Sequence, residues 1–307
     1  MSPTWSVKDA KSGERLRMGE CSACSLVQQL DLPSEQALHI YYSHHYRQDY
    51  KSAFQPRLKH VQRAGHTALH RLQRMATMGV TARGQRLIDI GAGGGEFCFM
   101  AQKNGFDVLG IEPHEGYSEF ARDQYGIHIK TCGLAQMDSA SADVVTMFHV
   151  LEHLAHPQQV AEKVWQMLRP GGVWVVEVPN ILQIDASPHN IYFKAHLFYY
   201  SRHSLVAATS RFFDVQHVQD DGNLLAVLTK RSEPREHMVW PKAEDLQRAR
   251  QQMATKGWWQ YLTVGGGWRK PAQRVRRLLQ ERQMPQIQAR DLLQQMHDSS
   301  HARPYGQ

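Results

Sequence analysis

The sequence predicts a doubly wound α/β fold, that is, a mostly parallel sheet with helices on both faces. From Arg86 onward, short apolar runs alternate with helical segments, as in successive strand–helix units. The first run leads directly into a glycine-rich turn at Gly91–Gly95. The last two runs, Phe212–Val218 and Leu224–Thr229, are split by Asp-Asp-Gly-Asn at 220–223. This spacing predicts a closing antiparallel pair at one edge of the sheet.

The apolar runs are short and nearly continuous, which is typical of strands that are covered on both faces. The expected strands are, in order, 86–90, 108–111, 127–130, 143–148, 173–178, 212–218 and 224–229. The expected helices between them run to about Asn104, to about Tyr125 and over 157–168. The third of these helices should end at Pro170-Gly171-Gly172, because proline and glycine cannot continue it.

The segments outside this core show other patterns. Residues 1–20 are polar and are expected to be poorly ordered. Residues 32–78 favour helix, starting at Pro33-Ser34-Glu35, and this stretch should form a helical cap. Tyrosine and histidine are enriched in the cap, at Tyr41, Tyr42, His44, His45, Tyr46 and Tyr50. A helical appendage is expected at the other end, with helices over 245–256, 271–283 and 287–297.

The composition favours a soluble globular protein over a membrane-spanning or disordered one. The chain has 307 residues, 42% of them hydrophobic and 21% charged, and a mean hydropathy of −0.52. No apolar run approaches the roughly 20 residues of a membrane-spanning helix. The first residues lack the apolar core of a secretory signal, so a cytoplasmic location is expected.

The positive charge is concentrated at the C-terminal end. The chain has 36 basic and 29 acidic residues and a net charge of +7. Residues 230–307 hold 15 of the basic and 7 of the acidic residues, so residues 1–229 are nearly neutral. Because this body is neutral and contains no nucleic-acid reader motif, nucleic acid is not expected as a partner.

The glycine turn carries the strongest chemical signal. It has the form Asp-x-Gly-x-Gly-x-Gly and lies between a buried strand and a helix. Glycines at 91, 93 and 95 allow positive φ and a close approach of the backbone to a ligand. The dinucleotide fingerprint fails, because its third glycine position holds Glu96. Asp89 and this acid favour a cationic ligand over a phosphate.

A second acid, Glu112, ends the next strand, where a carboxylate can accept hydrogen bonds from both ribose hydroxyls. The later segments Asp143–His153, Leu168–Gly172, Glu177–Asn180 and His196–Leu205 follow in a fixed order. Together these motifs resemble the class I S-adenosylmethionine-dependent methyltransferases, over about residues 85–230. The nearest resemblance is to the branch with small-molecule and sugar methyltransferases and to ubiquinone-type O-methyltransferases.

The resemblance implies a seven-stranded Rossmann-like sheet and S-adenosylmethionine as cofactor. It implies that the residues around the cofactor are Asp89, Gly91, Ala92, Gly93, Gly95, Glu112, Pro113, Leu134, Ala135, His149 and Val150. Many members carry an acid beside the adenine, and here the nearest is Asp138. The predicted domains are a lead-in and cap (1–80), the methyltransferase domain (81–230) and a basic appendage (231–307). The alternative is a nucleotide-like fold that has lost its ligand.

An alcohol acceptor benefits from a base with a pKa near neutrality, and three histidines are candidates. His149, together with His153 or His196, is the preferred base, because it follows the fourth strand, where ligands bind in open α/β sheets. His153 lies four residues further on, and His196 lies in the last family segment. For His153 the alternative is a structural role at a helix start. Asn180 and Tyr192 are weaker candidates for binding the acceptor.

Cys21 and Cys24 form one C-x-x-C pair, which resembles half of the zinc ribbon that precedes some sugar C-methyltransferases. A zinc site of this kind needs a second such pair, and residues 1–20 contain neither cysteine nor histidine. We therefore expect a degenerate ribbon without zinc, and no other metal site is predicted. The tyrosines that follow could form a lid over the cofactor or simply pack the cap.

The appendage contains a predicted amphipathic helix with a cationic face. Its apolar positions are Val275, Leu278 and Leu279, and basic residues surround them. Residues 258–282, which include three tryptophans, could dock on an anionic membrane or a protein partner, or could simply be solvated.

The primary hypothesis is an S-adenosylmethionine-dependent methyltransferase that acts on a hydroxyl of a small-molecule or saccharide acceptor, which could be anionic. The alternatives are a sugar C-methyltransferase and an assembly or docking protein that binds a partner or the inner face of the membrane through its tail. The acceptor and the oligomeric state cannot be read from the sequence.

Overall fold

The structure is a computed structural model, which describes residues 2–41, 55–282 and 287–302. Most of the tyrosine- and histidine-rich stretch, namely Tyr42, His44, His45, Tyr46 and Tyr50, lies outside the described residues. Among the described residues, no helix is long and apolar enough to cross a bilayer.

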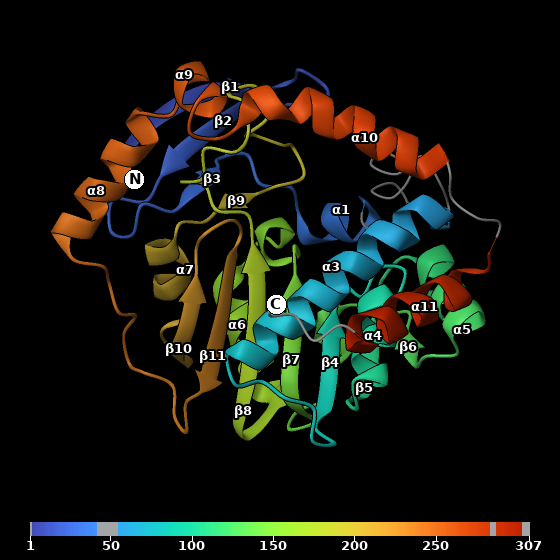
Figure 1. Cartoon of the computed structure of the whole chain (residues 1–307). Helices are drawn as coiled ribbons and strands as arrows, with labels where there is room; N and C mark the ends of the chain where they lie inside the picture. Colours follow the sequence, from blue (N-terminus) through green and yellow to red (C-terminus); the bar gives the residue numbers. More distant parts are fainter. Residues whose placement is uncertain (1, 42–54, 283–286, 303–307) are drawn as a thin grey trace. The chain divides into compact units, whose positions relative to one another are not determined.

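The predicted α/β fold class is confirmed. Hydrogen bonds order seven strands into a mixed sheet in the sequence β10-β11-β8-β7-β4-β5-β6 (Figure 1). The strands are β4 (Arg86–Ile90), β5 (Asp107–Ile111), β6 (Ile129–Lys130), β7 (Ala142–Phe148), β8 (Leu168–Val178), β10 (Phe213–Gln219) and β11 (Leu224–Lys230). β4 pairs in parallel with β5 and β7, and β10 and β11 form the expected antiparallel pair. The sheet therefore has the crossover connections of a doubly wound fold.

The helices lie close to the predicted positions. Those of the central region are α3 (Leu58–Thr77), α4 (Glu96–Lys103), α5 (Glu115–Tyr125), α6 (Pro157–Met167) and α7 (Arg202–Thr209). Those nearer the ends are α1 (Glu35–Ile40), α8 (Ala243–Ala254), α9 (Trp258–Leu262), α10 (Lys270–Arg282) and α11 (Ala289–Ala302). The predicted helix start at Glu35 is confirmed. The predicted end of the helix before Pro170-Gly171-Gly172 is confirmed, since α6 ends at Met167. The predicted start of the next strand at 173 is wrong, because β8 begins at Leu168 and includes these three residues.

By compactness the chain divides into two units. One consists of Glu35–Met147, Gln166–Val175 and Gln283–Gln307, and the other of Met1–Ser34, Phe148–Trp165 and Val176–Arg282. The predicted domain boundaries at residues 80 and 230 are drawn around the methyltransferase-like motifs, so they differ from these compact units. These boundaries stay a prediction.

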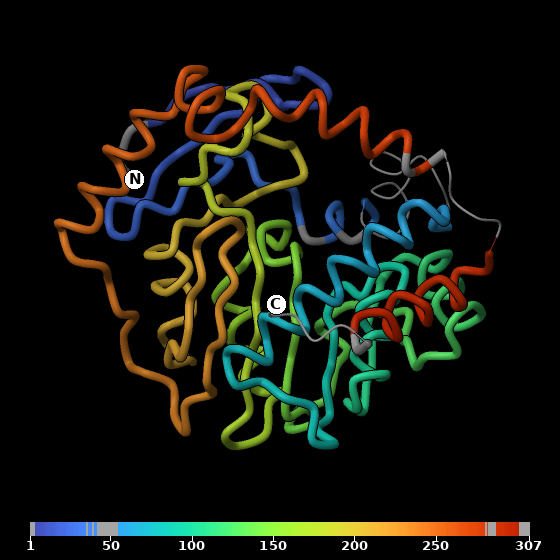
Figure 2. Tube along the Cα trace, in the orientation of Figure 1, coloured from blue at the N-terminus to red at the C-terminus, as the bar shows by residue number. Residues whose placement is uncertain are grey.

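In the first unit, the C-terminal helix packs onto a helix that lies far from it in the sequence. α11 lies beside α3, as the Cα trace also shows (Figure 2). A Cβ built on Gly65 of α3 would approach Leu293 Cδ2 to 2.6 Å, and Leu293 is fully buried. The absence of a side chain at Gly65 therefore lets the Leu293 side chain pack directly against α3, and a larger residue there would require Leu293 and Met296 to shift. The end of the chain is thus part of the α/β unit.

The second unit contains a four-stranded antiparallel sheet, β1-β2-β3-β9, that the sequence did not predict. Its strands are β1 (Ser2–Lys8), β2 (Arg15–Glu20), β3 (Val27–Gln29) and β9 (Phe198–Tyr199). Buried side chains on one face form a small apolar cluster of Leu16, Met18, Val27, Ile181 and Tyr199.

The expectation that residues 1–20 are poorly ordered is wrong, because β1 and β2 lie within them and pair with each other. In Arg15-Leu-Arg-Met18 polar and apolar residues alternate, and Leu16 and Met18 are buried while the arginines remain outside. Alternation over four residues is a weak signal for a strand. The segment forms a strand here because β2 pairs with β3, and β3 in turn pairs with β9 from a distant part of the chain.

Candidate functional site

The glycine turn has the predicted backbone conformation. β4 is nearly all apolar and buried, and it leads into a turn where Gly91, Gly93 and Gly95 have φ values of 74°, 59° and 83°. Gly95 is also the residue that caps α4, and a Cβ there would meet Ala121 Cβ at 2.7 Å and Ile127 Cδ1 at 2.6 Å. Positive φ and this crowding both require glycine. The turn is thus held in a single shape by the helix and strand that flank it.

Glu112 contacts this turn directly. Its carboxylate accepts hydrogen bonds from the backbone N–H groups of Gly93, at 2.8 Å, and His114, at 3.2 Å. The residue is 3% exposed. The glycine turn and Glu112, which are predicted to bind the same ligand, are therefore in direct contact. The strand order brings them together, because β4 and β5 are parallel neighbours whose carboxyl ends share an edge.

Asp89 lies within β4 and is buried against the neighbouring strand. Its Oδ1 accepts a hydrogen bond from the Thr146 hydroxyl, at 2.7 Å, and the Cys98 thiol lies 3.6 Å from its Oδ2. Burial raises the pKa of Asp89 to about 6, although the hydrogen bond from Thr146 opposes this shift. The predicted role of Asp89 beside the methionine part of the cofactor stays a prediction.

The other cofactor candidates of this unit lie around the same sheet edge. Ala92 is buried within the turn, and Pro113 follows Glu112 and is half-buried. Leu134 and Ala135 form a short 3₁₀ helix that comes after β6, and Asp138 is exposed. All follow carboxyl ends of parallel strands, which is where ligands bind in open α/β sheets.

His149 and Val150 come directly after β7 and belong to the other compact unit. His149 has a φ of 56°, in the left-handed region that a residue with a side chain rarely adopts. Its backbone N–H donates to the Glu177 carbonyl at 2.8 Å, which holds this conformation. Strained backbone of this kind often occurs at functional sites. The predicted contact of His149 and Val150 with the sulfonium stays a prediction.

The His149 ring lies between two carboxylates. Nδ1 is 3.3 Å from Glu152 Oε1, and Nε2 is 3.6 Å from Glu177 Oε1. Asn223 Nδ2 lies 3.1 Å from His149 Nε2 and donates to Glu177 Oε1 at 2.9 Å. Burial disfavours the charged ring, but the two carboxylates outweigh it and raise the pKa of His149 to about 9. His149 is therefore an imidazolium at neutral pH.

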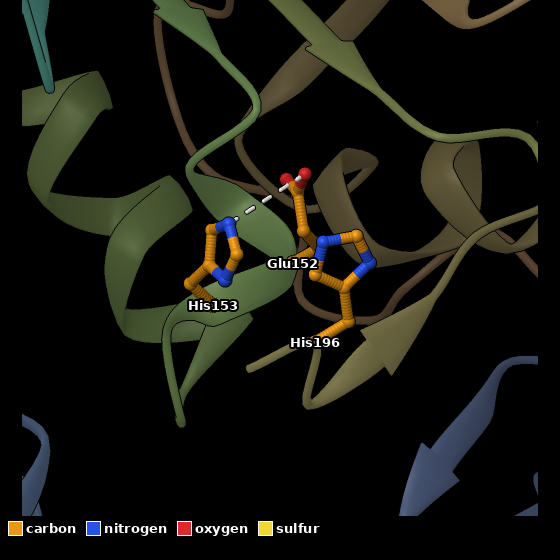
Figure 3. A group of neighbouring side chains, drawn as sticks. All are labelled: Glu152, His153 and His196. Carbon is orange, nitrogen blue, oxygen red and sulfur yellow. Dashed lines mark ion pairs between the residues drawn. The ribbon is translucent and has the colours of Figure 1, made fainter. Parts of the chain in front are cut away.

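The three predicted histidines are brought together around one carboxylate, that of Glu152. Glu152 is completely buried, and its Oε1 lies 3.9 Å from His153 Nε2. The rings of His153 and His196 pack edge to face, with centroids 4.8 Å apart (Figure 3). Burial would raise the pKa of Glu152, but the surrounding histidines lower it to about 2. The carboxylate of Glu152 is thus surrounded by three histidine rings.

His196 differs from His149 in protonation. Burial lowers the pKa of His196 to about 3, so its ring is neutral. His153 Nδ1 lies 2.7 Å from the carbonyl oxygen of Ala195, which is 42 residues away in the sequence. Because a carbonyl only accepts, Nδ1 carries the proton of this bond. The partner is thus distant in sequence, unlike the local helix-start contact considered as the alternative for His153.

The weaker candidates for binding the acceptor have structural partners. Asn180 Oδ1 accepts from the Leu182 N–H at 3.0 Å, and the Tyr192 ring packs on Tyr199 with centroids 5.2 Å apart. The sequence analysis did not identify Glu177 and Asn223 as part of the site. Glu177 lies at the end of the last parallel strand, so its position could have been recognised, but Asn223 reaches the cluster from the hairpin turn.

Comparison with known proteins gives a consistent result. The family model described as "Methyltransferase domain" matches residues 58–212, about half of the chain, and includes every predicted cofactor and histidine residue. The ubiquinone biosynthesis O-methyltransferase of Psychrobacter cryohalolentis is 30% identical over 118 residues, which cover 35% of this chain and 45% of that protein. A probable S-adenosylmethionine-dependent methyltransferase of Mycolicibacterium smegmatis is 32% identical over 108 residues, covering 34% and 41%.

The chain thus spans less than half the length of the curated relatives it matches. Among solved structures, an S-adenosylmethionine-dependent methyltransferase from Mesorhizobium loti is 19% identical, with a TM-score of 0.45. That similarity covers 52% of this chain and 96% of the other.

Proposed function

We propose, from the fact that this chain belongs to the class I S-adenosylmethionine-dependent methyltransferases, that it methylates a hydroxyl group of a small-molecule or saccharide acceptor. Membership in this family establishes the cofactor and the type of enzyme. Transfer to oxygen is supported by its relatives in ubiquinone biosynthesis, whose printed name is O-methyltransferase. The observation that carries the proposal is the group of imidazoles around Glu152.

The glycine turn and Glu112 are proposed to hold the cofactor. Backbone N–H groups of the turn can approach the ligand closely, and a buried carboxylate at the end of β5 suits the two ribose hydroxyls. The Glu112 carboxylate accepts hydrogen bonds from the Gly93 and His114 N–H groups, which orient it for this task. A preoriented anion loses little side-chain entropy on binding.

The chemistry needs a place for one proton. The acceptor oxygen forms a bond to the methyl carbon, the bond from sulfur to that carbon breaks, and S-adenosylhomocysteine leaves with the electron pair. The hydroxyl proton passes to a base. Because the sulfonium is a good leaving group, positioning and removal of this proton are the main tasks of the protein.

Protonation narrows the choice of base. His149 holds its proton up to a pH of about 9, so it cannot accept another at neutral pH. The pKa of His196 is lowered, so its ring is neutral, and the hydrogen bond to the Ala195 carbonyl places a proton on Nδ1 of His153. We therefore assign the base role to His153 or His196 and give His149 the role of orienting Glu152 by charge.

Replacement of His153 or His196 by alanine is expected to lower kcat by about 10²- to 10⁴-fold, the usual contribution of a general base. The dissociation constant for S-adenosylhomocysteine should stay within about twofold. The measurement is transfer of a radiolabelled methyl group to a panel of phenols, catechols and sugars. His217→Ala, on exposed β10, is the matched control and should leave kcat unchanged. Equal kcat values in all variants would refute the base assignment.

The second candidate is methyl transfer to carbon, as in sugar C-methyltransferases. It is suggested by the cysteine pair of the N-terminal sheet, which resembles half of the zinc ribbon that precedes some of these enzymes. Cys21 and Cys24 lie in the turn that joins β2 to β3, and burial raises the pKa of Cys24 to about 12. The two positions of the methyl group are distinguished by mass spectrometry of the product after acid hydrolysis.

The tail is proposed to dock on an anionic lipid surface. Trp259 and Val264 are 73% and 77% exposed, and Trp268 and the apolar stripe of α10 are also exposed. Basic side chains lie on the opposite face of the same helix, and three exposed arginines are within four residues. Exposed indoles with a cationic helix match an interfacial segment, in which apolar groups insert and cations meet lipid phosphates.

The triple variant Arg274→Gln, Arg276→Gln, Arg277→Gln is expected to weaken binding to phosphatidylglycerol vesicles by about 100-fold, since each basic residue contributes about 1 kcal/mol near such a surface. Binding is measured by vesicle sedimentation. Arg248→Gln, on exposed α8, is the matched control. Equal binding to neutral phosphatidylcholine vesicles, or none to either, would contradict lipid docking. A raised KM for an anionic acceptor would instead assign the tail to that acceptor.

A further inference from the structure

We infer that Glu152, His153 and His196 form a binding site for one divalent transition-metal ion. One ligand-capable atom from each residue lies within 4.8 Å of the others, and Figure 3 shows the Glu152 carboxylate facing both rings. All three residues belong to the same compact unit. The sequence analysis predicted no metal ligands, because His196 is far from the Glu-His pair in the chain.

Two features of the histidines suit metal binding. His153 Nδ1 donates to the Ala195 carbonyl at 2.7 Å, and the other ring nitrogen, Nε2, lies on the side of Glu152. A second-shell bond of this kind, from the other ring nitrogen to a backbone carbonyl, is the usual arrangement of a ligating histidine. His153 Nε2 also lies 3.9 Å from Glu152 Oε1, so two atoms with lone pairs face one another. A cation between them would turn this repulsion into attraction.

Glu152 gives the independent observation. The residue is completely buried, and neither carboxylate oxygen has a hydrogen-bond partner in the described structure. Its contact with His149 is an ion pair, with 3.3 Å between Oε1 and Nδ1. Buried carboxylate oxygens normally accept several hydrogen bonds or coordinate a metal. The second carboxylate at His149, that of Glu177, would help to balance the charge of an added ion.

The donor set selects the kind of ion. Two imidazole nitrogens and one carboxylate oxygen suit Zn²⁺, Mn²⁺ or Fe²⁺, whereas Mg²⁺ and Ca²⁺ prefer oxygen alone. Ligands at about 2.1 Å from an ion are roughly 3.4 Å apart in a tetrahedral site. The pair at 3.9 Å must therefore close by about 0.5 Å. Three protein ligands leave at least one position open, as in catalytic rather than structural sites.

The consequence for catalysis rests on the proposed function, whereas metal binding itself does not. An acceptor hydroxyl bound at the open position would lose its proton to water more readily, because a divalent ion stabilises the alkoxide or phenolate. With the ion bound, His153 and His196 act as its ligands and the base role proposed above for them falls to water. The open position would select acceptors with a hydroxyl that can coordinate, in particular two adjacent hydroxyls, as in a catechol or a vicinal diol.

The test uses the full, untagged chain. The protein is stripped with a chelator, dialysed against micromolar Zn²⁺ or Mn²⁺ and analysed by inductively coupled plasma mass spectrometry. We expect about one ion per chain. Glu152→Gln and His196→Ala should each weaken binding at least about 100-fold in a chelator competition, the upper part of the range for loss of a metal-site residue. Circular dichroism and S-adenosylhomocysteine binding show whether each variant is folded.

Two matched controls locate the ion. His237→Ala removes an exposed histidine beside Glu236, and Cys21→Ser with Cys24→Ser removes the thiol pair; both should retain one ion. A metal-free wild type, or loss of the ion only in the cysteine variant, would overturn the inference. A chain that binds the ion but not S-adenosylhomocysteine would contradict the proposed function alone. Unchanged methyl transfer by the metal-free enzyme would contradict the catalytic role of the ion.

Discussion

Glu112→Ala is expected to weaken binding of S-adenosylhomocysteine by at least about 100-fold. The wild-type carboxylate is buried at the end of β5 and is oriented by the Gly93 and His114 N–H groups. On the proposed assignment of Glu112 to the ribose, the variant would lose two hydrogen bonds to the cofactor, and each hydrogen bond to a charged group contributes about 1.5–3 kcal/mol. It also leaves the Gly93 N–H without its acceptor, so the turn becomes less well ordered. Isothermal titration calorimetry measures the change.

Glu115→Ala is the matched control, because this exposed glutamate lies three residues further on in the first turn of α5. It should bind the ligand as the wild type does. Glu112→Gln keeps the size of the side chain and one acceptor oxygen, so an intermediate affinity is expected. A wild-type affinity in Glu112→Ala would show that the cofactor lies elsewhere, and failure of the wild type to bind would refute the assignment of the site.

Glu152→Ala is expected to lower the free energy of unfolding by about 1–3 kcal/mol at pH 6. Removal of one partner from a fully buried ion pair costs about 3–5 kcal/mol, and the cost is smaller here because the His149 side chain, which keeps its charge, is 36% exposed. In the variant the charge that remains is that of His149. Its nearest carboxylate is then that of Glu177, at 3.6 Å, instead of that of Glu152, at 3.3 Å. Chemical denaturation followed by circular dichroism measures the loss.

The pH dependence of this difference has a definite sign. The pKa of Glu152 is lowered to about 2, so its contribution is present above its unfolded value of 4.5 and is lost as the pH falls through 2. The pKa of His149 is raised to about 9, so its contribution is present below 6.5 and is lost as the pH rises through 9. The difference between wild type and variant should therefore be greatest between about pH 4.5 and 6.5.

The control for this series is Glu162→Ala, which removes an exposed glutamate from α6 and should change the free energy of unfolding by less than about 0.5 kcal/mol. A difference for Glu152→Ala that did not vary between pH 5 and pH 10 would contradict the ion pair. In that case the loss would come from the cavity alone, which does not titrate.

These predictions connect two features of the second compact unit. The strained His149 backbone and the cluster around Glu152 occupy neighbouring positions in one short segment after β7. A metal ion at Glu152 and an imidazolium at His149 would both stabilise the same buried carboxylate. The metal therefore should reduce the effect of His149 substitutions on stability, a coupling that the same denaturation experiment detects when it is repeated with Zn²⁺.

Much of the fold could be predicted from local sequence. The apolar strand at Arg86–Ile90, the glycines of the following turn and the acid at Glu112 each depend on short-range rules, and their predicted conformations agree with the structure. The positions of the later strands and of most helices also follow from local periodicity. The N-terminal sheet could not be predicted in this way, because β3 is three residues long and is stabilised by β9, which lies far away in the sequence.

The sequence by itself determined the α/β class, the glycine turn and the family, because these depend on residue types at fixed spacing along the chain. Only the tertiary structure decided how His149, His153 and His196 differ. The protonation of His149 and His196 depends on burial and on nearby charges, and the orientation of His153 depends on the Ala195 carbonyl; the fold brings these groups together from separate segments. A pKa or a metal-ligand set is a property of such an environment, and residue identity alone does not contain it.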